Sequence, residues 1–168
     1  GTIAGIFEAQ AKYGKLKPAD IILPVIELAE KGFIVTARQA ERLQRMRETF
    51  IEVNGVETFY GKEFTAGDTI KNLALANTLK RIAENGRAEF YQGETGKVLA
   101  TFIQEKGGII TEADLADYQA AWRDPIVFGY KDLKIISMAP PSSGGITIAQ
   151  IFGMIEDYDL KDYGHHSQ

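Results

Sequence analysis

The segment Pro140-Pro141-Ser142-Ser143-Gly144-Gly145 combines residue types that could bind an anion. Its prolines stiffen the backbone, its serines offer hydroxyl groups, and its glycines allow the chain to turn closely into a following helix. Backbone N–H groups at the start of a helix can hold a phosphate or a carboxylate. However, the segment lacks the lysine and the spacing of a nucleotide P-loop, and it is not a G-x-G-x-x-G motif.

A tight turn between a strand and a helix explains the same residues without any ligand. A serine would then cap the helix that follows, and Gly144 would adopt a positive φ. We therefore interpret these residues as a structural turn, made of Pro140, Pro141, Ser142, Ser143, Gly144 and Gly145.

The histidines of the chain, His165 and His166, are adjacent near the end of the sequence. Adjacent side chains point apart in a helix or a strand, and no third ligand is close in sequence, so we predict no metal site. A Ser-His-Asp triad would need one of these histidines as its base, and their terminal position disfavours that arrangement.

Acidic and aromatic side chains also have structural explanations. Carboxylates near predicted helix starts interact favourably with the helix dipole, and nothing in their spacing pairs them as acid and base. These are Glu105, Glu112, Asp114 and Asp117. Aromatic residues at helical spacing are interpreted as core residues. They are Phe90, Tyr91, Tyr118 and Trp122.

Composition limits the classes of protein that this chain can represent. Its 168 residues predict a single unit over 1–168, and 45% of them are apolar, which is typical of a globular chain. The 19 basic and 23 acidic residues give a net charge of −4, so nucleic acid and anionic membranes are poor candidates for partners. The absence of cysteine excludes disulfides and a thiolate nucleophile. We predict no cofactor and no membrane-spanning segment.

Apolar residues recur at helical spacing in several segments that end at glycine, proline or turn residues. The predicted helices cover 2–14, 18–32, 36–50, 75–85, 99–107, 111–122 and 148–164. Thr2, Thr36 and Thr111 are expected to cap the helices that they begin. Residues 52–68 carry no firm prediction. The β-branched and aromatic residues of 126–138 flank the polar pair Lys131-Asp132, which predicts a β-hairpin.

Several short motifs, in order along nearly the whole chain, resemble landmarks of the gamma-glutamyltransferase (gamma-glutamyltranspeptidase) family. They are Gly1-Thr2-Ile3-Ala4-Gly5, Lys12-Tyr13-Gly14, Leu28-Ala29-Glu30-Lys31-Gly32-Phe33, Phe90-Tyr91-Gln92-Gly93, the segment from Thr111 to Tyr118, and the segment from Met138 to Gly145. Ala139 stands where the family often has a third proline. The order and coverage of these motifs identify the chain as similar to a segment of the family's large subunit.

This resemblance implies an α+β fold of the N-terminal nucleophile hydrolase superfamily, present here in part and mostly helical. It implies a precursor that is exported to the periplasm or cell surface and cuts itself into a large and a small subunit. In the family, the new N-terminal threonine of the small subunit attacks the γ-glutamyl carbonyl of glutathione and related amides. The expected partners of this chain are therefore the small subunit and a small γ-glutamyl substrate.

The same resemblance implies that this chain holds no catalytic and no substrate-binding residue. The family's nucleophile motif, Thr-Thr-His followed by an aromatic residue, does not occur in it. The family's arginine for the substrate carboxylate precedes Gly1, and the serines and glycines of its oxyanion site come from the small subunit. The Ser-Ser-Gly-Gly residues here match the large-subunit turn. We also expect the apolar stripes of 75–83 and 148–155 to be partly bare, because central strands of the core are missing.

Two alternatives stay open from the sequence. Cephalosporin acylases and capsule-anchoring transpeptidases share this large-subunit pattern, so the substrate is less narrowly defined than the chemistry. A noncatalytic helical binding module could instead use the turn at 140–145 as an anion nest. The sequence that follows Gln168 would distinguish an enzyme from such a module.

Overall fold

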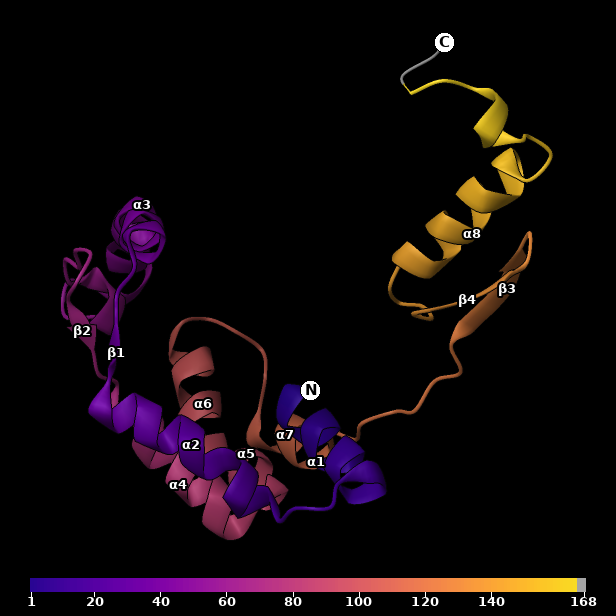
Figure 1. Cartoon of the computed structure of the whole chain (residues 1–168). Helices are drawn as coiled ribbons and strands as arrows, with labels where there is room; N and C mark the ends of the chain where they lie inside the picture. The colour runs from indigo at the N-terminus through magenta and orange to yellow at the C-terminus, as the bar shows by residue number, and fades with distance from the viewer. Residues whose placement is uncertain (166–168) are drawn as a thin grey trace. The chain divides into compact units, whose positions relative to one another are not determined.

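The structure is a computed structural model, and it describes residues 1–165. Contacts between Cα atoms divide the chain into two compact units, Gly1–Ala120 and Ala121–Gln168. The sequence predicts one unit, because no linker rich in proline, glycine and serine separates the two. Figure 1 shows the helices and strands of both units.

The first unit is built mainly of helices. Its elements in chain order are α1 (Thr2–Tyr13), α2 (Pro18–Lys31), β1 (Phe33–Ile34), α3 (Ala37–Asn54), the 3₁₀ turn η1 (Phe59–Gly61), β2 (Thr69–Ile70), α4 (Leu73–Asn85), α5 (Arg87–Gln92), α6 (Glu94–Glu105) and α7 (Glu112–Asp117). The helices expected at 18–32 and 75–85 are confirmed within one or two residues. The short helix α5, the turn η1 and the strands β1 and β2 were not anticipated.

The helices α2 and α4 pack against each other and form a hydrophobic core of the first unit (Figure 1). Ile26, Ala29 and Ala76 are buried at the centre of this contact. Leu79 and Ala83 of α4 pack around them. Helix α2 therefore covers part of the apolar stripe of α4, and Leu75 of that stripe is 45% exposed, in agreement with the expectation of a partly bare stripe at 75–83.

The strands β1 and β2 form a two-residue antiparallel pair in which Phe33 is opposite Ile70. Gly32 precedes this pair with φ +89, a conformation that L residues rarely adopt. A Cβ atom on Gly32 would lie 2.6 Å from Cγ2 of Thr69 and 2.8 Å from the carbonyl oxygen of Ile70. Position 32 therefore requires glycine, both because of its positive φ and because β2 leaves no room for a Cβ atom.

Capping residues were predicted correctly for two of the helices. Thr36 Oγ1 accepts a hydrogen bond from the Gln39 amide at 3.3 Å, and Gln39 Oε1 accepts one from the Thr36 amide at 2.9 Å. Thr111 and Asp114 form the same reciprocal capping box ahead of α7. The predicted cap at Thr2 is wrong, because Thr2 is the first residue inside α1 and its side chain makes no capping bond.

The second unit consists of a β-hairpin and a helix. Strands β3 (Ile126–Tyr130) and β4 (Leu133–Ser137) pair antiparallel with Tyr130 opposite Leu133, so the predicted hairpin is confirmed. The helix α8 (Gly144–Ile155) packs on this hairpin through Phe152, whose ring stacks on Tyr130 with centroids 4.5 Å apart. A 3₁₀ turn, η2 (Leu160–Asp162), follows.

Much of the apolar surface of the second unit is exposed. Ile148 and Ile151 of α8 are 41% and 45% exposed, and Val127 and Ile136 of the hairpin are 50% and 64% exposed. The helix carries no charged residue on any face, which is typical of a helix that is surrounded by protein. The expectation of a partly bare stripe at 148–155 agrees with this exposure.

Two helices are shorter than the sequence predicted. The helix expected over 111–122 ends at Asp117, because Tyr118 adopts an extended conformation. The last α-helix ends at Ile155 and does not extend to Gly164. In both segments the apolar spacing continues beyond the residues whose backbone is helical.

Candidate functional site

The turn at Pro140–Gly145 lies between β4 and the start of α8. The Pro140–Pro141 peptide bond is cis, and the Ser142 amide donates a hydrogen bond to the carbonyl oxygen of Ala139 at 3.2 Å. Ser143 precedes α8 with helical backbone angles, and its side chain makes no capping bond. The predicted serine cap is therefore wrong. A cap needs extended backbone angles to direct its oxygen at the helix amides, and Ser143 does not adopt them.

Gly145 is the glycine of this turn that the packing requires. It is buried, and a Cβ atom there would collide with the carbonyl oxygen of Met138. The positive φ predicted for Gly144 is wrong, and a Cβ on Gly144 would have Ser142 Oγ as its nearest neighbour at 3.7 Å. The close approach of α8 to the end of β4 explains the glycine at position 145.

A surface groove of about 640 Å³ lies beside this turn in the second unit. Its lining includes Arg123, Ile136, Met138 and Ser142. No carboxylate or imidazole is part of that lining. The groove therefore offers one cation and hydroxyl groups, but no side chain that could act as a general base near neutral pH.

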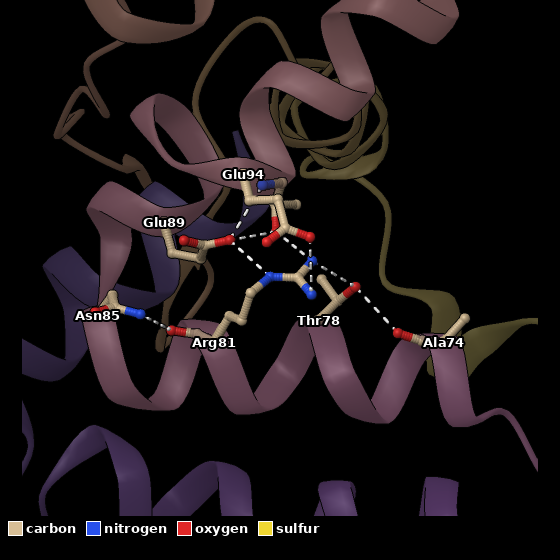
Figure 2. A network of polar contacts seen from close by, with 7 residues as sticks. Ala74, Thr78, Arg81, Asn85, Glu89 and Glu94 are labelled. Atoms are coloured by element: carbon tan, nitrogen blue, oxygen red, sulfur yellow. Dashed lines mark hydrogen bonds and ion pairs between the residues drawn. The ribbon is translucent and has the colours of Figure 1, made fainter.

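A polar network in the first unit surrounds Glu89 (Figure 2). Among the described residues, Glu89 is the one charged side chain that is buried. Its Oε1 accepts hydrogen bonds from Arg81 Nε at 2.9 Å, from Thr95 Oγ1 at 2.8 Å and from the Thr95 amide at 3.1 Å. Arg81 also donates to Thr78 Oγ1 and lies 3.4 Å from the exposed carboxylate of Glu94. Helices α4, α5 and α6 all contribute to this network.

The network keeps Glu89 ionised. The hydroxyl of Thr95 is the largest cause that lowers the pKa of Glu89, and the Thr95 amide and Arg81 lower it further, against a rise from desolvation. A carboxylate with a lowered pKa is a weak base, and near neutral pH it carries no proton that it could donate as an acid. We therefore interpret the network as structural. No local motif in the sequence indicates this network, because Arg81, Glu89 and Thr95 are separated along the chain.

Tyr91 and Tyr118, which the sequence placed in the core, differ in burial. Tyr91 is 2% exposed and its hydroxyl accepts a hydrogen bond from the Ala4 amide at 3.2 Å. Tyr118 is 39% exposed and stacks on Tyr91 with ring centroids 5.5 Å apart. Arg87 lies over the Tyr91 ring and donates a hydrogen bond to the Tyr118 carbonyl oxygen. These contacts join α1, α5 and the end of α7.

Of the other aromatics, Phe90 is half-buried, whereas Trp122 is 54% exposed and so is not a core residue of its unit.

Metal-ligating side chains do not cluster in the part of the chain that the structure describes. Over residues 1–165, no group of three or more His, Asp or Glu side chains lies where it could hold a metal ion. His166 lies outside these residues. Asp114 serves the α7 cap, where the Thr111 hydroxyl and then the Thr111 amide lower its pKa. None of the described helices has the length and apolarity that a bilayer span requires.

Comparisons with known proteins cover the whole chain. The family model described as Gamma-glutamyltranspeptidase matches residues 1–168. The glutathione hydrolase proenzyme of Escherichia coli K12 is 40% identical over 99% of this chain, and the match covers 30% of that protein. The acylase ACY 1 proenzyme of Pseudomonas sp. SE83 is 34% identical over 99% of this chain and 30% of that protein.

Solved structures also match almost the whole of this chain. The gamma-glutamyltranspeptidase of Helicobacter pylori superposes with a TM-score of 0.94 and 38% identity, over 100% of this chain and 49% of that chain. The Bacillus anthracis transpeptidase enzyme CapD superposes with a TM-score of 0.85 and 26% identity, over 99% of this chain and 58% of that chain. The chain thus spans about three tenths of the length of the curated relatives and about half of the solved chains.

Proposed function

Because the chain belongs to the gamma-glutamyltranspeptidase family, we propose that it is a large-subunit segment of an enzyme that cleaves γ-glutamyl amides such as glutathione. The enzyme transfers the γ-glutamyl group to water or to an amino acid. The observation that carries this proposal is the family match over residues 1–168 together with the TM-score of 0.94 to the Helicobacter pylori enzyme. The activity is assigned to the longer protein, since the segment spans 30% of its Escherichia coli relative.

The fold class predicted from the sequence is confirmed. The structural relatives include a gamma-glutamyltranspeptidase and CapD, which belong to the N-terminal nucleophile hydrolase superfamily. The chain is mostly helical with two small antiparallel sheets, and it represents part of that α+β fold.

The proposed reaction uses an N-terminal threonine outside these 168 residues. Its hydroxyl oxygen attacks the γ-glutamyl carbonyl carbon while its own α-amine takes the hydroxyl proton. Backbone N–H groups stabilise the oxyanion that forms. The C–N bond then breaks, the amine leaves with the proton, and an ester remains on the threonine. Water or the amine of an amino acid then attacks this ester and gives up a proton. The ester C–O bond breaks, the threonine oxygen regains its proton, and the γ-glutamyl product is released.

The proposed role of this chain in that reaction is structural. No threonine in it is followed by Thr-His and an aromatic residue. The turn at Pro140–Gly145 is held by its own backbone. Gly145 lies close to the Met138 carbonyl oxygen, and the Ser143 carbonyl oxygen accepts hydrogen bonds from the amide and the hydroxyl of Thr147. The buried carboxylate Glu89 is held by Arg81 and Thr95.

A precursor that is cut in two accounts for the coverage of the relatives. The segment fills 49% of the solved Helicobacter pylori chain but 30% of the Escherichia coli proenzyme, so the solved chain is much shorter than a precursor. This difference supports the placement in the large subunit. The partner is then the small subunit of the same precursor. We further propose that the mature enzyme works in the periplasm or outside the cell.

A second candidate function comes from relatives with other substrates. The acylase ACY 1 proenzyme is 34% identical over almost the whole chain, and CapD shares the fold with a TM-score of 0.85. A cephalosporin acylase or a capsule-anchoring transpeptidase would use the same threonine chemistry on a different acyl group. The higher identity to the glutathione hydrolase proenzyme, 40%, favours the γ-glutamyl substrate.

The test compares the segment with the longer protein that contains it. We expect the reading frame after Gln168 to continue into a Thr-Thr-His-aromatic motif, and the expressed precursor to cut itself before that motif. The mature protein should release p-nitroaniline from γ-glutamyl-p-nitroanilide. Residues 1–168 alone should release none above the blank.

Two variants of the motif's first threonine make this test specific. Replacement by alanine should abolish both self-cleavage and amine release, whereas replacement by serine keeps a hydroxyl nucleophile and should retain some of both. Activity on a cephalosporin side chain but not on γ-glutamyl anilide would favour the acylase. A reading frame that stops near Gln168 would favour a noncatalytic module.

A further inference from the structure

An apolar groove of about 550 Å³ lies in the first unit. Helices α2 and α4 line one part of it, and α3 with η1 lines another. We call it the α3 groove. Its volume falls in the range of about 300 to 1,000 Å³ that is typical of small-molecule sites.

The walls of the α3 groove are formed by large apolar side chains that stay accessible. Leu28 of α2, Met46 of α3 and Leu75 of α4 line it and are 51%, 39% and 45% exposed. Aromatic rings complete the lining, where Tyr60 lies 5.4 Å from the Phe50 centroid and 4.9 Å from that of Phe59. Binding of an apolar molecule would remove this apolar surface from contact with water, which is energetically favourable.

The wall formed by α3 and η1 is held in place by hydrogen bonds. Arg47 Nε donates to the Gly61 carbonyl oxygen at 2.8 Å, and Arg47 lies 3.8 Å from the carboxylate of Glu63. The capping box of Thr36 and Gln39 fixes the start of α3. The groove is therefore formed before any ligand binds.

Arg42 and Arg45 of α3 line the groove together with these apolar side chains. Both are exposed, and within residues 1–165 neither has a carboxylate oxygen within 4.0 Å of its guanidinium group, unlike Arg47. Arg38 lies one turn before Arg42 on the same helix but does not line the groove. Guanidinium groups bind carboxylates through paired, charge-assisted hydrogen bonds.

We propose that the α3 groove binds a small molecule with an apolar body and a carboxylate group, such as a medium-chain fatty acid. The apolar body lies against Leu28, Met46 and Leu75, and the carboxylate accepts hydrogen bonds from Arg42 and Arg45. The proposal does not depend on the γ-glutamyl transfer reaction.

The experiment measures ligand binding to the intact protein that contains this segment. Decanoate and its methyl ester displace the neutral dye Nile red, so that the carboxylate can be separated from the apolar chain. We expect decanoate to bind more tightly than the ester. The double variant R42Q/R45Q should bind decanoate about tenfold more weakly and the ester within about twofold of the wild type.

Two further variants keep the result interpretable. Arg38→Gln removes the same charge from the same helix outside the groove and should leave both affinities within about twofold. Met46→Trp fills the groove and should abolish the displacement by both probes. Equal decanoate affinity in the wild type and R42Q/R45Q would overturn the proposal. So would a lack of probe binding to the intact protein when residues 1–168 alone bind it, because another part of the precursor would then cover the groove.

Discussion

The phenol oxygen of Tyr91 accepts a hydrogen bond at 3.2 Å from the backbone amide of Ala4, 87 residues earlier in the chain. Ala4 lies in the first turn of α1, where backbone amides have no partner within the helix. A side chain of α5 therefore satisfies a free amide at the start of α1, the capping role that the sequence predicted for Thr2. Both Ala4 and Tyr91 are buried, so the bond is shielded from water.

Replacing Tyr91 with phenylalanine should destabilise the protein by about 1 to 3 kcal/mol, because the buried Ala4 amide would lose its acceptor. The ring and its stacking on Tyr118 are kept in this variant. Tyr118→Phe is the matched control, and it should change the free energy of unfolding by less than about 0.5 kcal/mol. Urea unfolding of both variants measures the difference, and equal losses would contradict the role of the Tyr91 hydroxyl.

Glu89→Gln should lower the free energy of unfolding more than Glu94→Gln does. The Glu89 side chain is 8% exposed and bonded to Arg81 and Thr95, whereas the Glu94 side chain is 65% exposed. Because the pKa of Glu89 is lowered in the folded state, its ionised form stabilises the protein fully above the ordinary pKa of glutamate. This stabilisation is lost as the pH falls through the lowered pKa.

The pH dependence of the Glu89 variant follows from that sign. The difference in unfolding free energy between the wild type and Glu89→Gln should be constant near neutral pH and shrink in acid, as Glu89 of the wild type takes up a proton. Urea unfolding at a series of pH values measures it. A difference that grows on acidification would contradict the lowered pKa.

Gly145→Ala should destabilise the second unit by about 1 to 3 kcal/mol, since the added Cβ would collide with the Met138 carbonyl oxygen. Gly144→Ala is the matched neighbour. It has room for a Cβ and begins α8, so alanine should be neutral or stabilise by up to about 1 kcal/mol. Thermal melts of the two variants decide this, and a larger loss at Gly144 would refute the packing argument.

A comparison of Gly32 with Gly55 distinguishes the cost of backbone strain from the cost of a steric collision. Both end a helix, with φ and ψ of 89° and 170° at Gly32 and 88° and 166° at Gly55, but a Cβ on Gly55 meets nothing within 4 Å. Gly55→Ala should therefore lose only the strain energy, about 1 to 3 kcal/mol. Gly32→Ala should lose about 1 to 3 kcal/mol more, because the Cβ also meets β2. Similar losses of unfolding free energy in the two variants would show that Gly32 is not packed closely against β2.

Residues 1–168 produced alone should self-associate through the apolar surface of α8 and the hairpin. Ile148, Ile151 and Ile136 are each more than 40% exposed, and exposed apolar patches of this kind promote association. The double variant Ile148→Lys/Ile151→Lys should shift the chain toward the monomer. Light scattering coupled to size exclusion measures the mass, and a stable 18.6 kDa monomer of the unchanged chain would contradict this prediction.

The sequence by itself was sufficient where a structure depends on residues within one or two turns of each other. The Thr36 and Thr111 capping boxes join residues three apart, and the hairpin at 126–138 joins neighbours across a short polar turn. Such local preferences act in any compact fold that the chain adopts. The motifs from Leu28 to Phe33 and from Met138 to Gly145 also identified the family, and these motifs contain Gly32 and Gly145, the glycines that close packing requires.

Only the tertiary structure decided which distant side chains satisfy one another. The Ala4 amide of α1 has its partner, Tyr91, on α5. The Glu89 carboxylate of α5 has one of its partners, Arg81, on α4. A two-residue strand such as β1 has no periodic pattern of its own, and it pairs with β2 because α2 and α4 bring their ends together. Partners of this kind are selected by packing, since a buried polar group is stable only beside whichever donor or acceptor the fold places there.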